Sequence, residues 1–236
     1  MKIAIMQPYF FPYLGHFSLI KHTDRFIIID IVQYIKQGWI ARNRILRQQE
    51  GWQYINVPLC SHSRGTLIKD IKIQNNADWK YKIMGQLRHY PNHPPYSAQV
   101  EKLCNGLFAK DFEGIVSLNV SALERVLEYL GIERKIEVLS EMDLPIEQPE
   151  DSDEWGLNIC LALGNVDEYW NPPGGKSFYD RSKYEKNGIK LCFHEIELTP
   201  YSQNRDYFEA GLSILDVMMF NPAQEINNML DNYSIS

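Results

Sequence analysis

The first 30 residues, MKIAIMQPYFFPYLGHFSLIKHTDRFIIID (1–30), contain the pattern that decides the fold. Residues 1–6 form a short apolar run that is typical of a buried strand, and residues 25–30 form a second one. Residues 16–22 lie between them and predict a short helix. Strand, loop, helix and strand in this length make a βαβ unit, in which the first loop lies at the carboxyl edge of the sheet. Ligands bind at that edge in open α/β sheets.

The rest of the chain continues this alternation. Further strands are expected at residues 53–59, 67–73, 135–139, 168–170 and 189–195. Further helices are expected at residues 79–90, 98–108, 113–130, 155–163, 181–186 and 211–220, followed by a polar tail. The pattern predicts an α/β fold with a Rossmann-like, mostly parallel sheet. We expect a single α/β domain over residues 1–236, with a mainly helical insertion at about 78–135.

Composition excludes several classes of partner. The net charge of -6 argues against a nucleic-acid partner, which usually requires a basic face. No apolar run is long enough for a membrane span, and Gln7, Pro8 and Pro12 interrupt what would be the apolar core of a secretory signal. The four cysteines are widely spaced, so we expect reduced thiols in a cytoplasmic protein. The six histidines show no metal-ligand spacing, and we expect no metal site.

The loop after the first strand, QPYFFPY (7–13), is dense in proline and aromatic residues. One interpretation is structural: the prolines fix the backbone, and the aromatic rings pack under the sheet. The functional interpretation places the polar tips of Gln7, Tyr9 and His16 in a cleft, with an anion at the helix N-terminus near Gly15. The tetrapeptide YLGH (13–16) partly resembles the His-x-Gly-His pattern of nucleotidylyl transferases, but its first histidine is missing.

A second candidate region, YIKQGWIARNR (34–44), has three hydrogen-bond donors in a row after a Gly-Trp pair. Arginine binds carboxylate or phosphate through two parallel hydrogen bonds, so this stretch suits the capture of an anion. Alternatively it is a solvated loop whose Trp39 covers the core and whose arginines pair with acids such as Asp30. The candidate ligand-binding residues here are Tyr34, Trp39, Arg42, Asn43 and Arg44.

Asp216 lies in an otherwise apolar helix and is a candidate buried carboxylate. It either contributes to a pocket or anchors an arginine or a backbone group. Tyr201 and Gln203 are candidates for the wall of the same pocket. Among the cysteines, Cys60 is the best candidate for a nucleophile, because His62 follows it by two residues.

Several of these motifs together resemble the WbqC-like family of bacterial proteins. They are residues 6–20, 30–45, 56–59 with 67–73, 174–180 with 188–195, 200–203 and 212–220. The resemblance implies a role in surface-polysaccharide or natural-product biosynthesis. It also implies transfer of a glycyl or other acyl group to the amino group of an amino sugar or related metabolite.

Acyl transfer to an amine needs a base and donors that stabilise the developing oxyanion. We expect Asp30 or His16 to be the base. Gln7, Tyr9 and Asn43 are the expected donors to the oxyanion or to the substrate. No metal is required, because a thioester already has a good leaving group.

Arg42 and Arg44 are expected to hold the pyrophosphate of a nucleotide-linked sugar or the phosphate of a pantetheine arm. The sequence therefore predicts no tightly bound cofactor, but an acyl thioester of coenzyme A or of an acyl carrier protein as co-substrate. This scheme requires Gln7, Asp30 and residues 42–44 to meet around one hollow. An adenylate-forming or nucleotidyl-transferring enzyme and a non-catalytic binding protein are the alternatives.

Overall fold

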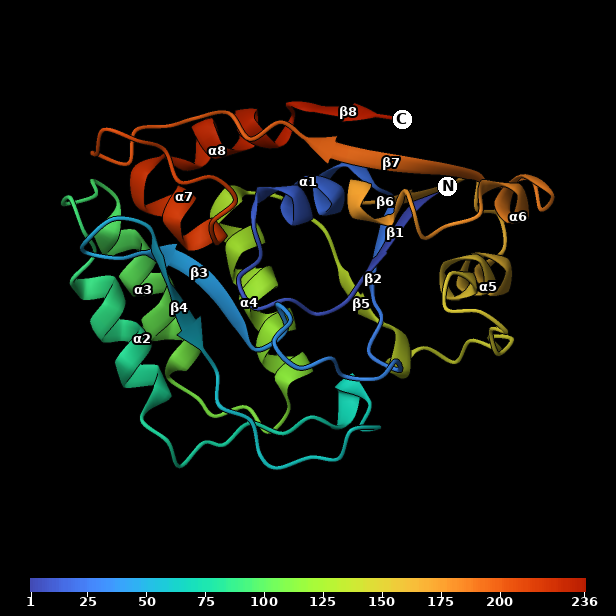
Figure 1. Cartoon of the computed structure of the whole chain (residues 1–236), viewed down its shortest axis with the longest axis horizontal. Helices are drawn as coiled ribbons and strands as arrows, with labels where there is room; N and C mark the ends of the chain where they lie inside the picture. Colours follow the sequence, from blue (N-terminus) through green and yellow to red (C-terminus); the bar gives the residue numbers. More distant parts are fainter.

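The computed structural model describes all 236 residues, and its centre is a six-stranded sheet (Figure 1). The order of the strands across the sheet is β5-β2-β1-β6-β7-β8, and every neighbouring pair is parallel except β7 with β8. Their bounds are β1 (Lys2–Met6), β2 (Arg25–Ile28), β5 (Ile136–Val138), β6 (Glu168–Asn171), β7 (Lys190–Ile196) and β8 (Tyr233–Ile235). The predicted Rossmann-like α/β fold is therefore confirmed.

Eight helices and a separate antiparallel hairpin surround this sheet. The helices are α1 (Leu14–His22), α2 (Trp79–Arg88), α3 (Ser97–Phe108), α4 (Ile115–Leu130), α5 (Glu154–Leu163), α6 (Arg181–Glu185), α7 (Ile214–Phe220) and α8 (Ala223–Leu230). The hairpin consists of β3 (Arg42–Leu46) and β4 (Trp52–Asn56). Three short 3₁₀ turns are η1 (Ile68–Asp70), η2 (Leu139–Glu141) and η3 (Pro173–Gly175). None of the helices combines the length and apolar composition needed to cross a bilayer.

The side chains of β1 alternate between two apolar clusters on the two faces of the sheet. Ala4 belongs to a cluster of 49 buried residues that also includes α1, the helices α2 to α4, α7 and α8. Ile3 and Ile5 belong to a second cluster of 14 buried residues, which includes α5 and α6. In Figure 1, α5 and α6 lie on the side of the molecule opposite to α2 and α3. Successive side chains of β1 therefore point to opposite faces of the sheet, and each face is covered by its own group of helices.

Two of the expected elements were wrong. The strand expected at residues 67–73 is instead the 3₁₀ turn η1 with isolated bridges to three different segments. Its buried residues are Ile68, Ile71 and Ile73, whose spacing of three and then two does not keep the alternation of a strand, and the segment forms no continuous ladder. The expected polar tail contains α8 and β8. Ile226, Met229 and Leu230 are buried on one face of α8, at the spacing typical of an amphipathic helix.

Candidate functional site

The candidate site lies where the chain reverses its direction of progress across the sheet, between β1 and β6. In open α/β sheets, ligands bind in the crevice outside the carboxyl ends of two such strands. A cavity of about 330 Å³ lies there, lined by Met6 at the end of β1 and by Pro172 just after β6. We call it the switch-point cavity. Its other lining residues are Tyr9, Pro12, Tyr13, Trp39, Asn43, Arg44, Leu198 and Gly211.

The loop 7–13 divides its aromatic residues between the core and this cavity. Phe10 and Phe11 are fully buried and pack edge to face, with ring centroids 4.9 Å apart. The backbone of Phe11 has a φ of 41°, in the left-handed region that is rare for a bulky residue. Tyr9 and Tyr13, on either side of this pair, line the cavity. The structural interpretation of the loop therefore applies to Phe10 and Phe11, whereas Tyr9 and Tyr13 are available to a ligand.

Asn43 holds the loop in this conformation. Its Nδ2 donates to the carbonyl oxygens of Phe10 at 3.0 Å and Phe11 at 2.8 Å, and its Oδ1 accepts from the backbone N–H of Arg44 at 2.8 Å. Both amide protons of Asn43 are therefore already used. It lines the cavity, but these contacts make it a positioning residue rather than the free donor to a substrate that the sequence suggested.

Two further residues that the sequence did not single out bind the same loop. Asn119 Nδ2 donates to the carbonyl oxygens of Pro8 at 2.7 Å and Ile40 at 2.9 Å. Ser213 Oγ donates to the carbonyl oxygen of Phe11 at 2.7 Å. In the sequence, Asn119 is one polar residue within a helix and Ser213 is a usual residue for a helix N-cap, so neither indicates a site. Only the folded chain shows that both contact loop 7–13.

Arg44 brings an unneutralised positive charge to the cavity. Its guanidinium carbon lies 5.4 Å from the ring centre of Trp39 and 5.2 Å from that of Trp52. One terminal nitrogen donates to the carbonyl oxygen of Gly211 at 3.1 Å, and no carboxylate forms an ion pair with it. An arginine fixed between two aromatic rings, with unused donors, is suited to bind a phosphate or a carboxylate.

Arg42 lies two residues earlier on β3 but does not line the cavity. Its guanidinium carbon is 4.3 Å from the ring centre of Tyr54, and it donates to the carbonyl oxygen of Gln37. It also forms no ion pair with a carboxylate. The two predicted arginines therefore lie on the same hairpin, but only Arg44 reaches the cavity.

Tyr9 and Tyr13 add two phenol side chains to the lining of the cavity. Burial raises the pKa of both phenols above the ordinary value, so both stay protonated. Gly15 makes room for Tyr13, because a β-carbon at this position would lie 2.5 Å from Tyr13 Cζ. The ring of Tyr13 therefore lies against the first turn of α1, where the sequence predicted an anion.

His16 lies behind Tyr9 rather than in the cavity. It is 1% exposed, its ring centroid is 5.5 Å from that of Tyr9, and neither ring nitrogen has a hydrogen-bond partner. Burial lowers the pKa of His16 to about 3, so the ring is neutral at physiological pH. The structure gives this predicted base no direct contact with the space that a substrate would occupy.

Asp30 also lies apart from the switch-point cavity. It accepts hydrogen bonds from the backbone N–H of Ser140 at 3.0 Å and from Ser140 Oγ at 2.5 Å. It lines a different cavity of about 400 Å³, together with residues of α4 and the turn after β5. Gln7 is partly exposed, and its side chain makes no hydrogen bond. The expected meeting of Gln7, Asp30 and residues 42–44 around one hollow is therefore wrong.

Tyr34 and the candidate nucleophile lie in a third place. Tyr34 lines a cavity of about 530 Å³ with His62, and their rings meet edge to face at 5.2 Å. His62 Nδ1 is 2.8 Å from the carbonyl oxygen of Cys60, while the thiol is 3.5 Å from the carbonyl oxygen of Ile73. The histidine thus bonds to the backbone of Cys60, and the structure shows no Cys–His pair.

Asp216, Tyr201 and Gln203 do meet, in a buried network away from the cavity. Tyr201 Oη donates to the Asp216 carboxylate at 2.5 Å, Gln203 Nε2 donates at 2.9 Å, and Tyr90 Oη donates to its second oxygen. Asp216 is fully buried, and burial raises its pKa to about 6. The carboxylate thus anchors two tyrosines and a glutamine, rather than the arginine or backbone group that the sequence suggested.

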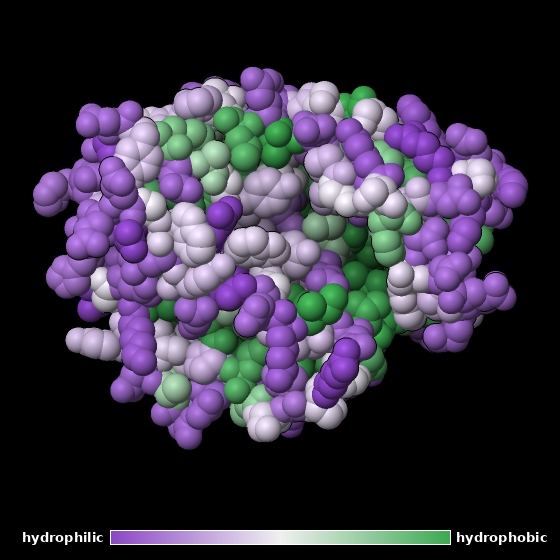
Figure 2. All heavy atoms as spheres, in the orientation of Figure 1, coloured by the Kyte–Doolittle hydropathy of each residue, from purple (hydrophilic) through white to green (hydrophobic).

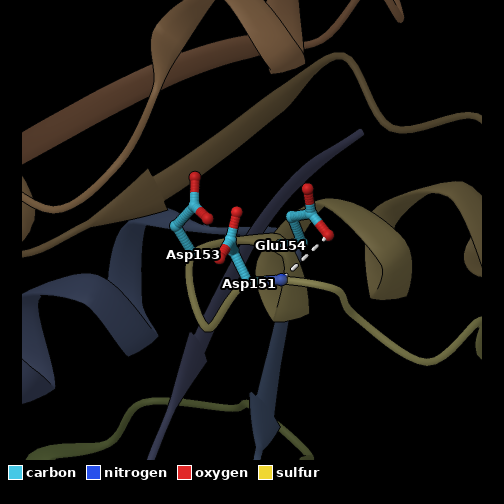
Figure 3. Close-up of side chains that lie close together, drawn as sticks. All are labelled: Asp151, Asp153 and Glu154. Atoms are coloured by element: carbon cyan, nitrogen blue, oxygen red, sulfur yellow. Dashed lines mark hydrogen bonds between the residues drawn. The ribbon is translucent and has the colours of Figure 1, made fainter.

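Three acidic side chains lie close together at the start of α5 (Figure 3). The carboxylates of Asp151, Asp153 and Glu154 approach within 4.8 Å of one another, and the backbone N–H of Asp151 donates to Glu154. The Lys183 ammonium group lies 2.7 Å from Glu154 and 3.2 Å from Asp153. Lys183 therefore neutralises part of the negative charge of this cluster.

Comparison with known proteins finds similarity over nearly the whole chain. The model of the WbqC-like protein family matches residues 7–228. The uncharacterized protein Rv1507c of Mycobacterium tuberculosis is 27% identical over 233 residues, which cover 97% of both chains. No solved structure matches the chain significantly. The matched region begins with loop 7–13 and includes every residue of the cavity except Met6. The chain belongs to the WbqC-like protein family.

Proposed function

We propose that this protein is an acyl- or aminoacyltransferase of the glycyl-transferring type. The acceptor would be the amino group of an amino sugar or related metabolite in surface-polysaccharide or natural-product biosynthesis. One observation carries the proposal: the switch-point cavity presents Arg44 without a carboxylate partner, next to two protonated tyrosines. Membership of the family supports the biosynthetic setting, since it agrees with the motifs of the sequence.

In the proposed reaction, the amine nitrogen attacks the carbonyl carbon of an acyl thioester. The C–N bond forms, the C–S bond breaks, and the departing thiolate takes up, through solvent, the proton that the amine loses. The hydroxyl groups of Tyr9 and Tyr13 would donate to the oxyanion of the intermediate. Arg44 would bind a phosphate or carboxylate of the substrate. Because Asp30 and His16 do not line the cavity, the proposal assigns the attack to the neutral form of the amine.

The co-substrate would be a thioester of coenzyme A or of an acyl carrier protein, with no tightly bound cofactor. Arg42 would hold the second phosphate of a nucleotide-linked sugar that extends from the cavity along the hairpin. A cytoplasmic location belongs to the same proposal. The four unpaired cysteines support it, because reducing compartments keep thiols free.

A non-catalytic binding protein is the second candidate. The observation in its favour is that no carboxylate, imidazole or thiol lines the switch-point cavity. Such a protein would hold the same anionic metabolite without changing it.

The test is to incubate the purified protein with acyl-coenzyme A and acyl-carrier thioesters, plus a panel of nucleotide-linked amino sugars, and to identify products by mass. Arg44→Ala is expected to lower kcat/KM by about 10- to 100-fold, the loss of one charged hydrogen bond. Arg88→Ala is the control, because this arginine lies on α2 and does not line the cavity.

The outcomes separate the candidates. Product formation that depends on Arg44 but not on Arg88 supports the transferase. Saturable binding that Arg44→Ala abolishes, without product from any donor, supports the binding protein. Consumption of ATP with magnesium in place of the thioester would support the nucleotidyl-transferring alternative.

A further inference from the structure

A larger hollow lies between β4 and α2, outside the switch-point cavity. It has a volume of about 720 Å³ and opens to the surface. We call it the β4–α2 groove. Figure 2 shows the face of the molecule that carries the hairpin, where purple and pale side chains predominate and apolar residues appear in patches between them. The polar or aromatic side chains that matter most are those of Tyr54, Asn56, Trp79, Lys82, Gln86 and His89.

We propose that the β4–α2 groove binds a hydroxyl-rich phosphorylated small molecule, of the sugar-phosphate class. Binding there does not depend on acyl transfer and can be measured without turnover.

The groove offers polar groups that the protein itself does not use. The Asn56 amide and the Tyr54 hydroxyl make no hydrogen bond within the protein, and the Lys82 ammonium group forms no ion pair. Amide and hydroxyl groups both donate and accept, which is what a ligand with several hydroxyls requires. These groups lie on a strand and a helix, and so on rigid elements.

Two side chains in the groove are fixed in place. Gln86 Nε2 donates to Gln53 Oε1 and to the carbonyl oxygen of Tyr54, each at 3.1 Å, which leaves Gln86 Oε1 as a free acceptor. The Tyr54 ring is held by Arg42, at 4.3 Å, and by the edge of Trp52, at 4.8 Å between centroids. A fixed aromatic ring beside free amides is suited to a ligand with apolar C–H faces and polar edges.

The charge of the groove indicates the phosphate. No aspartate or glutamate lines it, although the whole chain has a net charge of -6. Lys82 and His89 contribute the only titratable basic groups, and the Arg42 guanidinium lies behind Tyr54. Trp79 lies in the lining at 3% exposure, and its indole N–H has no acceptor in the protein.

Gly85 provides a way to block the groove without damaging the fold. A β-carbon at this position would meet no atom within 4 Å, so the space above it is empty. Gly85→Leu would fill that space, and leucine favours a helix by close to 1 kcal/mol over glycine. Tyr81→Leu is the matched control, since Tyr81 is 75% exposed on the same helix and does not line the groove.

The experiment measures the binding of glucose 1-phosphate, glucose and inorganic phosphate by calorimetry, with backbone amide shifts to locate the site. Glucose 1-phosphate is expected to bind at least 10-fold more tightly than either of the other two. Gly85→Leu and Lys82→Met are each expected to weaken it at least 10-fold, whereas Tyr81→Leu and Arg44→Ala leave it unchanged.

The proposal fails if glucose 1-phosphate does not bind, or if inorganic phosphate binds equally well. It also fails if Arg44→Ala removes binding while Gly85→Leu does not, because the ligand then lies in the switch-point cavity. Since Arg44→Ala tests the proposed function and Gly85→Leu tests the groove, each can fail without the other.

Discussion

Asp216 is a buried carboxyl group, and its burial disfavours the ionised form. It lies in the apolar helix α7, where burial raises its pKa from 3.8 to about 6 despite three donors. A raised carboxyl pKa means that the folded state binds the proton more tightly than the unfolded chain. The contribution of Asp216 to stability is therefore greatest below pH 4 and falls as pH rises to 6.

We predict that Asp216→Asn changes the pH dependence of stability. The free energy of unfolding of the wild type, minus that of the variant, should fall by about 2 kcal/mol between pH 4 and pH 7, since each pKa unit corresponds to ~1.4 kcal/mol and part of the loss has already occurred at pH 4. Urea unfolding of both proteins at pH 4, 5.5 and 7 measures this difference. A difference that stays constant or grows with pH would contradict it.

His16 gives the opposite dependence on pH. Burial lowers its pKa to about 3, so the folded state resists protonation while the unfolded chain binds a proton near pH 6.5. The wild type therefore loses stability as pH falls below 6.5.

We predict that His16→Leu raises the free energy of unfolding by about 1 kcal/mol at pH 8, because it removes two unpartnered nitrogens from the core. At pH 5 the advantage should grow by a further ~2 kcal/mol. Urea unfolding at the two pH values checks this. An equal advantage at both would show that the ring titrates in the folded state, and loss of product formation in the folded variant would support the predicted role as base.

Loop 7–13 is the element whose shape decides the site, and side chains distant in sequence maintain that shape. Asn43 and Asn119 each donate to two main-chain carbonyl groups in or beside it. We predict that Asn43→Ala lowers the free energy of unfolding by about 2 kcal/mol, because it leaves the buried carbonyl group of Phe10 without a donor and removes one of the two donors to the carbonyl group of Phe11. Asn119→Ala should have a similar effect. Urea unfolding provides the measurement.

The control for this pair is Asn76→Ala, an exposed asparagine without a side-chain hydrogen bond, which should change stability by less than ~0.5 kcal/mol. If Asn43→Ala is as mild as the control, the loop holds its conformation by aromatic packing alone.

The helices and most strands were predictable because their patterns are local. Gly131 and Gly164 end α4 and α5 at positive φ, next to the last residues of the helices expected at 113–130 and 155–163. Residues 67–73 were not predictable in this way. Apolar and charged residues are mixed there as in a strand, but the backbone makes isolated bridges to three separate segments instead of pairing with one. In α8, the three buried residues are separated by polar residues. For this reason the sequence suggested a polar tail rather than a helix.

The site was predictable in part, for a similar reason. Tyr9, Trp39, Asn43 and Arg44 line the cavity, and their residue types were the reason for choosing them. Asp30 was placed with them because it follows a strand at the same edge of the sheet. The sequence indicated the strands but not their order, and β2 lies next to β5, where Asp30 contacts Ser140.

At the scale of the whole molecule, the sheet ends on one side with the short strand β8, which covers the edge of β7. β8 pairs with β7 from His194 to Ile196, and Ser236 exchanges two backbone hydrogen bonds with Phe193. Without β8, the backbone groups of β7 would form an open edge, and open edges pair with other chains.

We predict that deleting residues 233–236 lowers the Tm by about 5 °C and causes self-association that increases with protein concentration. Thermal unfolding and light scattering measure the two effects. Ser234→Ala, at an exposed position of the same strand, should leave both unchanged. A truncated chain that stays monomeric with an unchanged Tm would show that β8 does not protect the edge.

The switch-point cavity collects its walls from Met6, Trp39, Arg44, Pro172, Leu198 and Gly211. These contributors span nearly the entire length of the polypeptide. A nascent chain still attached to the ribosome therefore lacks a complete cavity until Gly211 has been synthesised. Translation products that stop before Gly211 would lack part of the cavity wall, so they would not compete for its ligand.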